Sequence, residues 1–163
     1  SICLIFFFLT YNDVKSQEPK IIFGKAKVID GDTIKIDKNK IRLYGIDAPE
    51  KKQQCQKMWL SISFLTLNKN YQCGKISSNK LKVKINNKFI MCKSSNKDRY
   101  NRFIAECYKD KININKWMVS NGYAVAYKKY SKKFVAQENI AKKEKLGLWA
   151  GTFEMPWEWR KKN

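Results

Sequence analysis

Three short strands joined by tight turns near the start of the chain constrain its fold more than any other feature. Residues 21–29 alternate loosely between apolar and polar side chains. Residues 33–37 (TIKID) alternate with a period of two, which indicates a half-buried strand. After the turn at residues 37–40, the stretch 41–46 (IRLYGI) reads as a third strand that Pro49 ends. This spacing predicts a three-stranded meander.

Beyond the meander, the pattern predicts two more strands and about three helices. The strands are expected at residues 89–93 and 103–108, and the helices at 74–85, 114–118 and 131–146. Residues 51–72 have no clean period and are predicted to form a loop, and the aromatic tail after Gly147 is expected to pack back on the body. These elements favour an α+β, mainly β fold, a five-stranded barrel of the OB type formed by residues 17–163 as one domain.

The charge of the chain points to a polyanionic partner. Lys and Arg number 34 against 14 Asp and Glu, a net charge of +20. Such an imbalance favours nucleic acid or an anionic surface, with a merely basic soluble protein as the alternative. Only four cations are arginines, and an arginine kept among so many lysines suggests a need for its forked grip on phosphate or carboxylate. The four are Arg42, Arg99, Arg102 and Arg160.

The chain contains no histidine. This absence excludes Ser-His triads and imidazole acid–base chemistry, and it leaves only thiolates for a zinc site. An enzyme made from this chain must work with carboxylates and cations, to which a hard metal ion can be added.

The first residues have the character of a targeting segment. Residues 2–9 (ICLIFFFL) are continuously apolar, and a polar stretch follows. The run is too short to span a bilayer and is typical of a signal-peptide core, so residues 1–16 are predicted to be a signal peptide or membrane-targeting segment. We expect a secreted or periplasmic protein; an uncleaved membrane anchor is the alternative.

Cysteine usage agrees with export. Four cysteines lie outside the leader, with no CxxC pair, so two disulfides are favoured over a zinc site or four buried free thiols. Of the three possible connectivities, Cys55–Cys73 and Cys92–Cys107 are predicted because each closes a local loop.

Scarce carboxylates gather at the ends of the predicted strands. Asp32 begins the second strand and Asp47 ends the third, so both can meet at one end of the barrel. Ordinary turn acids, and a structural ion pair between Arg42 and Glu50, are the alternatives. Asp30 is expected to brace the turn at Gly31 rather than to act in catalysis.

Four motifs in this order resemble the staphylococcal nuclease (thermonuclease) family. They are DGDT at 30–33, IRLYGIDAPE at 41–50, DRYNR at 98–102 and AKKEKLGLW at 141–149, and the resemblance covers residues 25–149. It implies an OB barrel with five strands and three helices. It also implies Ca²⁺-dependent hydrolysis of DNA and RNA, with little sequence preference and 3′-phosphorylated products.

The resemblance also implies a metal site and a base. Asp32 and Asp47 would bind Ca²⁺ together with the main-chain carbonyl of Ala48, a position where the best-known member has Thr. Glu50 matches the proposed general base. Asp30 and Thr33 are expected to support these residues.

Further positions match the family's phosphate and nucleotide contacts. Arg42 and Arg102 match two arginines that clamp the reacting phosphate. Tyr100 matches a tyrosine near the nucleotide phosphate, and Tyr127 is a base-stacking candidate. Asn101 replaces the usual Gly before Arg102.

The expected partners are DNA and RNA, with single strands preferred. No stable protein partner is implied, and a monomer is expected. A non-catalytic OB module that only binds nucleic acid is the alternative function, and a basic protein that binds anionic lipid is a third. Neither needs the carboxylates Asp32, Asp47 and Glu50, which typically disappear from inactive relatives.

Overall fold

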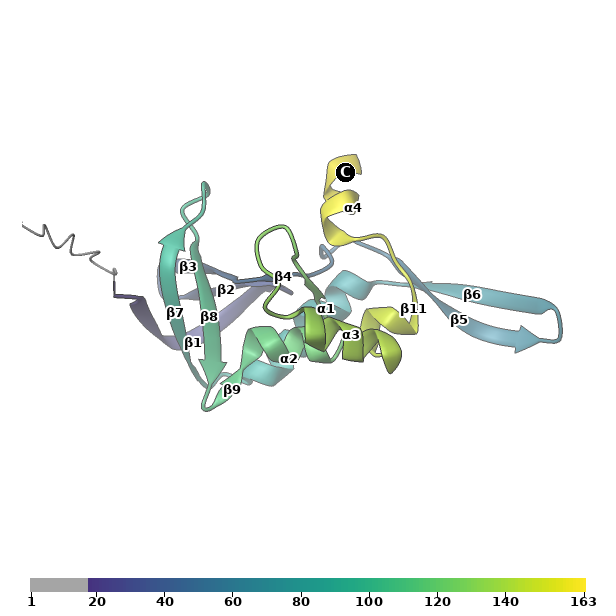
Figure 1. Cartoon of the computed structure of the whole chain (residues 1–163), viewed down its shortest axis with the longest axis horizontal. Helices are drawn as coiled ribbons and strands as arrows, with labels where there is room; N and C mark the ends of the chain where they lie inside the picture. The colour runs from purple at the N-terminus through teal and green to yellow at the C-terminus, as the bar shows by residue number, and fades with distance from the viewer. Residues whose placement is uncertain (1–17) are drawn as a thin grey trace, which may run out of the picture.

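The computed structural model describes residues 18–163, so the predicted targeting segment at residues 1–16 lies outside the described residues. Five strands form a closed, mixed barrel (Figure 1). They are β1 (Lys20–Asp30), β2 (Thr33–Ile36), β3 (Asn39–Leu43), β7 (Phe89–Lys97) and β8 (Phe103–Lys109). Neighbours in the order β3-β2-β1-β7-β8 pair antiparallel, and a parallel pairing between β3 and β8 closes the barrel. This is the OB-type α+β fold that the strand pattern predicted.

Short strands and helices complete the chain. The strands are β4 (Ile46–Asp47), β5 (Cys55–Ile62), β6 (Leu65–Tyr71), β9 (Ile112–Asn113), β10 (Val125–Ala126) and β11 (Gly151–Thr152). The helices are α1 (Cys73–Ile85), α2 (Ile114–Ser120), α3 (Val135–Lys143), α4 (Pro156–Lys162) and the 3₁₀ turn η1 (Gly147–Ala150). None of the helices among residues 18–163 has the length and apolar character needed to cross a bilayer.

Buried and less buried side chains alternate along β2 and β3, and the buried ones fill the barrel interior. Ile34, Ile36 and Ile41 are fully buried, while residues between them on β2 and β3 are less buried. Leu81 of α1 and Met118 of α2 belong to the same buried cluster, so two helices cover the barrel. Burial of apolar side chains on one face of each strand is the main force that holds the barrel together.

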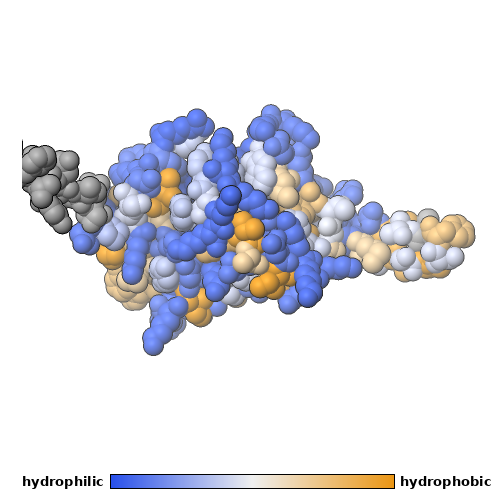
Figure 2. All heavy atoms as spheres, viewed as in Figure 1, coloured by the Kyte–Doolittle hydropathy of each residue, from blue (hydrophilic) through white to orange (hydrophobic). Residues whose placement is uncertain are grey.

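The predicted loop at residues 51–72 is wrong over residues 55–71, which form the β5–β6 hairpin. A register shift between Met58 and Leu60 interrupts the pairing, and this bulge removes the strict alternation that identifies a strand in the sequence. The hairpin projects from the body (Figures 1 and 2) and exposes Trp59 and Phe64 near its end. The sequence of the hairpin shows no regular alternation of apolar and polar residues, because no core lies against its tip.

Two helical segments differ from expectation. The predicted helix at 131–146 is shorter, because α3 begins at Val135 and ends at Lys143. The aromatic tail does pack back on the body, and it adds a short helix, α4, that begins at Pro156. Proline is favoured in the first turn of a helix, where its missing N–H costs no hydrogen bond.

Both predicted disulfides are present. Cys92–Cys107 joins direct cross-strand partners of β7 and β8. Cys55–Cys73 joins the first residue of β5 to the first residue of α1, which closes the base of the hairpin. Cys73 Sγ of this second disulfide lies 3.4 Å from the backbone oxygen of Gln53, so the disulfide borders the chain segment that follows Glu50.

Candidate active site

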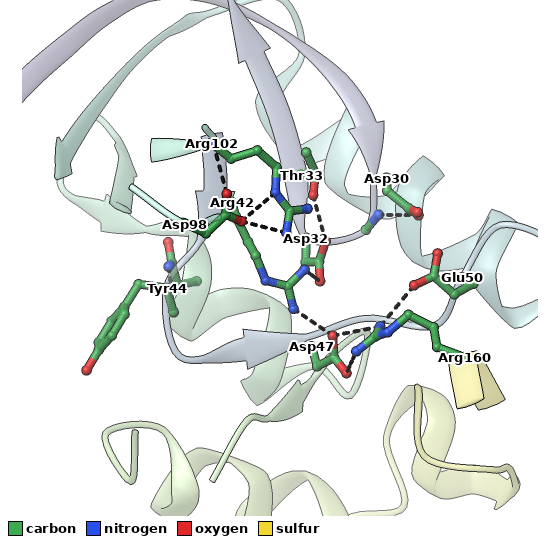
Figure 3. Close-up of polar contacts among 12 residues, drawn as sticks. Asp30, Asp32, Thr33, Arg42, Tyr44, Asp47, Glu50, Asp98, Arg102 and Arg160 are labelled. Carbon is green, nitrogen blue, oxygen red and sulfur yellow. Dashed lines mark hydrogen bonds and ion pairs between the residues drawn. The ribbon is translucent and has the colours of Figure 1, made fainter. Parts of the chain in front are cut away.

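Arg42 bridges the two carboxylates predicted to bind metal (Figure 3). It lies on β3 directly opposite Thr33 of β2, which places its guanidinium beside the turn that holds Asp32. Arg42 Nη1 donates to Asp32 Oδ2 at 2.6 Å, and Nη2 donates to Asp47 Oδ1 at 2.8 Å. The structure therefore brings Asp32 and Asp47 together at one end of the barrel, as predicted.

These carboxylates are almost removed from solvent. Asp47 is fully buried on β4, which pairs with β10, and Asp32 is also buried. Burial raises the pKa of the Asp47 carboxyl, and the neighbouring charge of Asp32 adds to this effect, although hydrogen bonding to Arg160 opposes it. Burial alone would lower the pKa of Arg42, but the charges of Asp32 and Asp47 raise it. Arg42 therefore stays cationic between them.

Thr33 and Asp30 have the supporting positions that were expected. Thr33 Oγ1 donates to Asp32 Oδ1 at 2.8 Å, which orients that carboxylate. Asp30 Oδ1 accepts from the backbone N–H of Gly31 at 2.8 Å, which agrees with a role in bracing the turn. Burial, opposed by the hydrogen bond from Gly31 and assisted by the nearby charges of Asp32 and Glu50, raises the pKa of the Asp30 carboxyl to about 7.

Glu50 is paired with an arginine that the sequence did not single out for this place. Arg160, from α4, donates through Nη1 to Glu50 Oε1 at 2.9 Å. The same Nη1 donates to Asp47 Oδ1 at 3.1 Å, and Nη2 donates to Asp47 Oδ2 at 2.8 Å. The alternative pairing of Arg42 with Glu50 is wrong, because Arg42 pairs with Asp32 and Asp47 instead.

The backbone around Glu50 is held by close packing. A Cβ added to Gly74 would lie 1.7 Å from the carbonyl oxygen of Glu50, so only glycine lets α1 start against this segment. The buried side chain of Gln53 accepts from the Glu50 N–H at 3.3 Å. Ala48 is buried against Gly31, since a Cβ on Gly31 would lie 2.7 Å from Ala48 Cβ.

Arg102 has a carboxylate partner of its own, Asp98. Its Nε donates to Asp98 Oδ2 at 2.8 Å, and its Nη2 lies 2.7 Å from the same oxygen. Asp98 Oδ1 accepts from the backbone N–H groups of Tyr100 and Arg102. Asn101 has a left-handed φ of 61°, which explains how it stands where the family has Gly, since Asn adopts this conformation more readily than most residues.

Arg42 and Arg102 line the same open groove, which has a volume of about 1180 Å³. Most of the charged residues that line it are basic, and Glu50, Tyr100, Tyr127 and Arg160 are among the lining residues. Tyr100 is exposed, whereas the ring of Tyr127 is stacked on Trp157 at 5.4 Å between ring centroids. Further lining residues include Lys40, Lys93, Arg99, Lys129 and Tyr130. A positive groove with aromatic side chains suits a nucleic acid.

The donor chemistry of the carboxylate cluster fits a hard divalent cation such as Ca²⁺. Asp32 and Asp47 offer buried carboxylate oxygens. Together with Glu50 they make three carboxylates, which share only two guanidinium groups, those of Arg42 and Arg160. Within residues 18–163 no three acidic or cysteine side chains form a ligand cluster. A cation at this place could use oxygens of Asp32 and Asp47, with backbone oxygens or water completing its shell, as Ca²⁺ sites allow.

Sequence reasoning missed four residues of this site: Gln53, Asp98, Trp157 and the role of Arg160. Only Arg160 carried a signal, because it is one of the four arginines in a chain that otherwise uses lysine. Asp98 stands inside the motif DRYNR, but nothing local reveals that its carboxylate holds Arg102.

The chain is similar in sequence to several known proteins. A family model described as staphylococcal nuclease homologue matches residues 40–151. A succinoglycan biosynthesis protein of Rhizobium meliloti (strain 1021) is 33% identical over 144 residues, 86% of this chain and 70% of that protein. An uncharacterized endonuclease of Escherichia coli is 34% identical over 148 residues, 85% of each chain. A probable staphylococcal-like nuclease of Oryza sativa subsp. japonica is 32% identical over 147 residues, 88% of this chain and 25% of that protein.

Proposed function

Because this chain belongs to the staphylococcal nuclease family, we propose that it is an exported, Ca²⁺-dependent nuclease that hydrolyses phosphodiester bonds of DNA and RNA. The observation that carries the proposal is the convergence of Asp32, Arg42, Asp47 and Glu50 at the edge of a basic groove. Phosphodiester hydrolysis needs an activated water, neutralised charge on the phosphorane and a stabilised leaving oxygen. This cluster offers groups for each need.

Asp32 and Asp47, with the main-chain carbonyl of Ala48, would hold the cation. Bound there, Ca²⁺ supplies positive charge that offsets the charge of the substrate phosphate. Thr33 donates a hydrogen bond to Asp32, which preorganises this one of the two carboxylates. The replacement of the family's Thr by Ala48 leaves the backbone oxygen in place.

Glu50 would orient and deprotonate the attacking water. Its carboxylate is about 30% exposed and lines the groove, so it can reach a water molecule beside a bound phosphate. Arg42 and Arg102 would stabilise charge on the phosphorane through their forked N–H groups. Arg102 would also assist the departing 5′-oxygen, which leaves 3′-phosphorylated products.

The groove suggests single-stranded DNA and RNA as substrates. Its basic residues would follow the phosphates, and Tyr100 and Tyr127 would contact the nucleotide, with little reading of base identity. The net charge of +20 would speed the encounter with a polyanion. We propose that the enzyme acts as a monomer. The two disulfides support export to an oxidising compartment, secreted or periplasmic.

Digestion of denatured DNA with and without a chelator tests this function. The wild type should cleave only with Ca²⁺, and Glu50→Gln should lose activity. Glu144→Gln is the matched control, because it removes an exposed carboxylate just beyond α3 and should cleave normally. Equal cleavage by wild type and Glu50→Gln would contradict the mechanism. Binding of an oligonucleotide without cleavage under any condition would instead favour the non-catalytic binding module.

A further inference from the structure

The C-terminal helix α4 contributes an arginine to the carboxylate cluster. Arg160 makes three hydrogen bonds of 2.8–3.1 Å, two to Asp47 and one to Glu50. Figure 3 shows it reaching Asp47 and Glu50 from the side away from Arg42. Its side chain is about one third exposed and lines the groove, so it lies at the boundary between the carboxylates and the substrate space.

Two anchors near the start of α4 set the position of Arg160. Gln53 Nε2 donates to the backbone oxygen of Glu154 at 2.7 Å, while Gln53 Oε1 accepts from the Glu50 N–H. One buried side chain thus ties the C-terminal segment to the backbone of Glu50. In addition, Trp157 stacks on Tyr127 with an interplanar angle of 9°. These contacts, together with the buried Pro156, hold the backbone of α4 against the body, so the fold itself places Arg160 beside Asp47 and Glu50.

The Glu50 carboxylate accepts its described hydrogen bond from this arginine. Among residues 18–163, Arg160 is the one cation that forms a salt bridge with Glu50. The other described contacts of Glu50 involve its backbone, through Gln53. A general base must be held within reach of the water that it deprotonates, and partners behind an acidic group supply that constraint.

We propose that Arg160 is a positioning residue of the active site, which holds the Glu50 carboxylate toward the groove. This inference rests on the proposed function, because it assigns Arg160 a task through Glu50. The C-terminal segment is then part of the catalytic apparatus, and α4 is more than a packing element.

The geometry also predicts that Arg160 weakens the binding of a cation, although it assists cleavage. Arg160 engages both oxygens of Asp47, and Arg42 shares one of them. A divalent cation on Asp47 would lie close to the guanidinium of Arg160, and like charges repel strongly in a partly buried site. Loss of the charge on Arg160 should therefore strengthen Ca²⁺ binding while it slows cleavage.

Arg160→Gln, measured for both Ca²⁺ binding and cleavage, provides the test. We expect kcat on denatured DNA to fall about tenfold to a hundredfold, with KM little changed. Calorimetric titration of the full chain with Ca²⁺ should show affinity that rises about fivefold. Lys161→Gln is the matched control: it removes one charge from the same helix, at a side chain 70% exposed that pairs with Glu158, and should match the wild type in both assays.

Two further variants separate positioning from a structural role. In a Glu50→Gln background, adding Arg160→Gln should lower kcat no further, because both changes act through one carboxylate. Guanidinium ions added to Arg160→Ala should restore part of its kcat, which they would not do for a variant that has lost its fold.

The possible results distinguish this inference from the proposed function. A wild type that does not bind Ca²⁺, or a Glu50→Gln variant with full activity, would overturn the proposed function. If those controls behave as expected, an Arg160→Gln variant with unchanged or higher kcat overturns only the inference. A parallel loss of kcat and Ca²⁺ affinity would show that Arg160 is merely structural.

Discussion

Arg42 donates a 2.8 Å hydrogen bond to Asp47, a carboxylate with no solvent exposure. Arg42→Met would leave Asp32 and Asp47 without this shared cation. Asp32 would then lose the cation that it pairs with, while Asp47 would keep only Arg160. Since a buried carboxylate that loses its cationic partner is strongly destabilising, the free energy of unfolding in the presence of chelator should fall by about 2–4 kcal/mol. Urea denaturation measures this change.

Excess Ca²⁺ should recover part of the loss in Arg42→Met, because a ligand that binds only the folded chain stabilises it. Arg99→Met, which removes an exposed arginine, is the control and should leave stability unchanged within about 0.5 kcal/mol. Equal stability of Arg42→Met and the wild type in chelator would mean that Arg42 does not compensate the buried carboxylates.

Arg102→Lys should reduce the rate far more than the affinity. Lysine keeps the charge but cannot reproduce the two contacts that Nε and Nη2 make with Asp98, so its ammonium group will be poorly oriented toward the phosphate. We expect kcat to fall about a hundredfold, a size typical of a lost transition-state donor. Affinity for a single-stranded oligonucleotide in chelator should change by less than about threefold.

Single-turnover cleavage and fluorescence anisotropy give these two quantities for Arg102→Lys. Lys111→Arg serves as the control, because it conserves charge at an exposed residue that does not line the groove. A variant that loses only binding would show that Arg102 holds the substrate without acting on the transition state.

Gly74→Ala should displace the segment that carries Glu50. The new Cβ would lie 1.7 Å from the Glu50 carbonyl oxygen and 2.5 Å from its carbonyl carbon, and backbone atoms cannot move aside as a side-chain tip can. We expect a loss of stability of about 1–3 kcal/mol and a clear fall in kcat. Thermal melting and cleavage assays check this, with Lys75→Ala on the exposed side of α1 as the control. Normal stability and activity in Gly74→Ala would contradict the packing described.

Glu138 should make stability depend on acid pH. This residue of α3 is buried, accepts from the Ala126 N–H at 3.1 Å, and pairs with Lys128 and Lys142 at 2.8 and 2.9 Å. Burial alone would raise the pKa of the Glu138 carboxyl, but hydrogen bonds from Lys128 and Lys142 outweigh it and hold the pKa below its usual value. The folded-state pKa is therefore lower than that of the unfolded chain.

A lowered folded-state pKa stabilises the protein above the unfolded value, about 4.3 for Glu, and this stabilisation disappears as pH falls through the folded-state pKa. Glu138→Gln should therefore cost about 1–3 kcal/mol at pH 7, and the difference from the wild type should shrink below about pH 4. Urea unfolding of both proteins across this range measures it. If the difference in the free energy of unfolding stays constant with pH, the charge of Glu138 contributes nothing to stability.

The barrel was predictable because its signals are local. Period-two alternation in residues 33–37 appears as the buried pair Ile34 and Ile36, and the short apolar runs at 89–93 and 103–108 became β7 and β8. Alternation reports which face of a strand is buried, so it fails where neither face meets a core. That is the reason the β5–β6 hairpin, with its bulge and exposed tip, was predicted as a loop.

The candidate site was predictable to the same extent. Asp32, Arg42 and Asp47 lie within one meander, and strand register alone brings them to one end of the barrel. Gln53, Trp157 and Arg160 act across the fold, since Arg160 meets Glu50 from 110 residues away in the chain. No spacing rule connects positions so far apart.

The sequence by itself determined the strand meander, the cysteine pairing, the strong positive charge and the motifs that carry the carboxylates. Each depends on neighbours along the chain or on composition, and therefore survives without knowledge of the fold. Only the tertiary structure decided which cation meets which carboxylate. That choice depends on how the C-terminal segment returns to the barrel, where Gln53 and Tyr127 anchor α4 and bring Arg160 to Asp47 and Glu50.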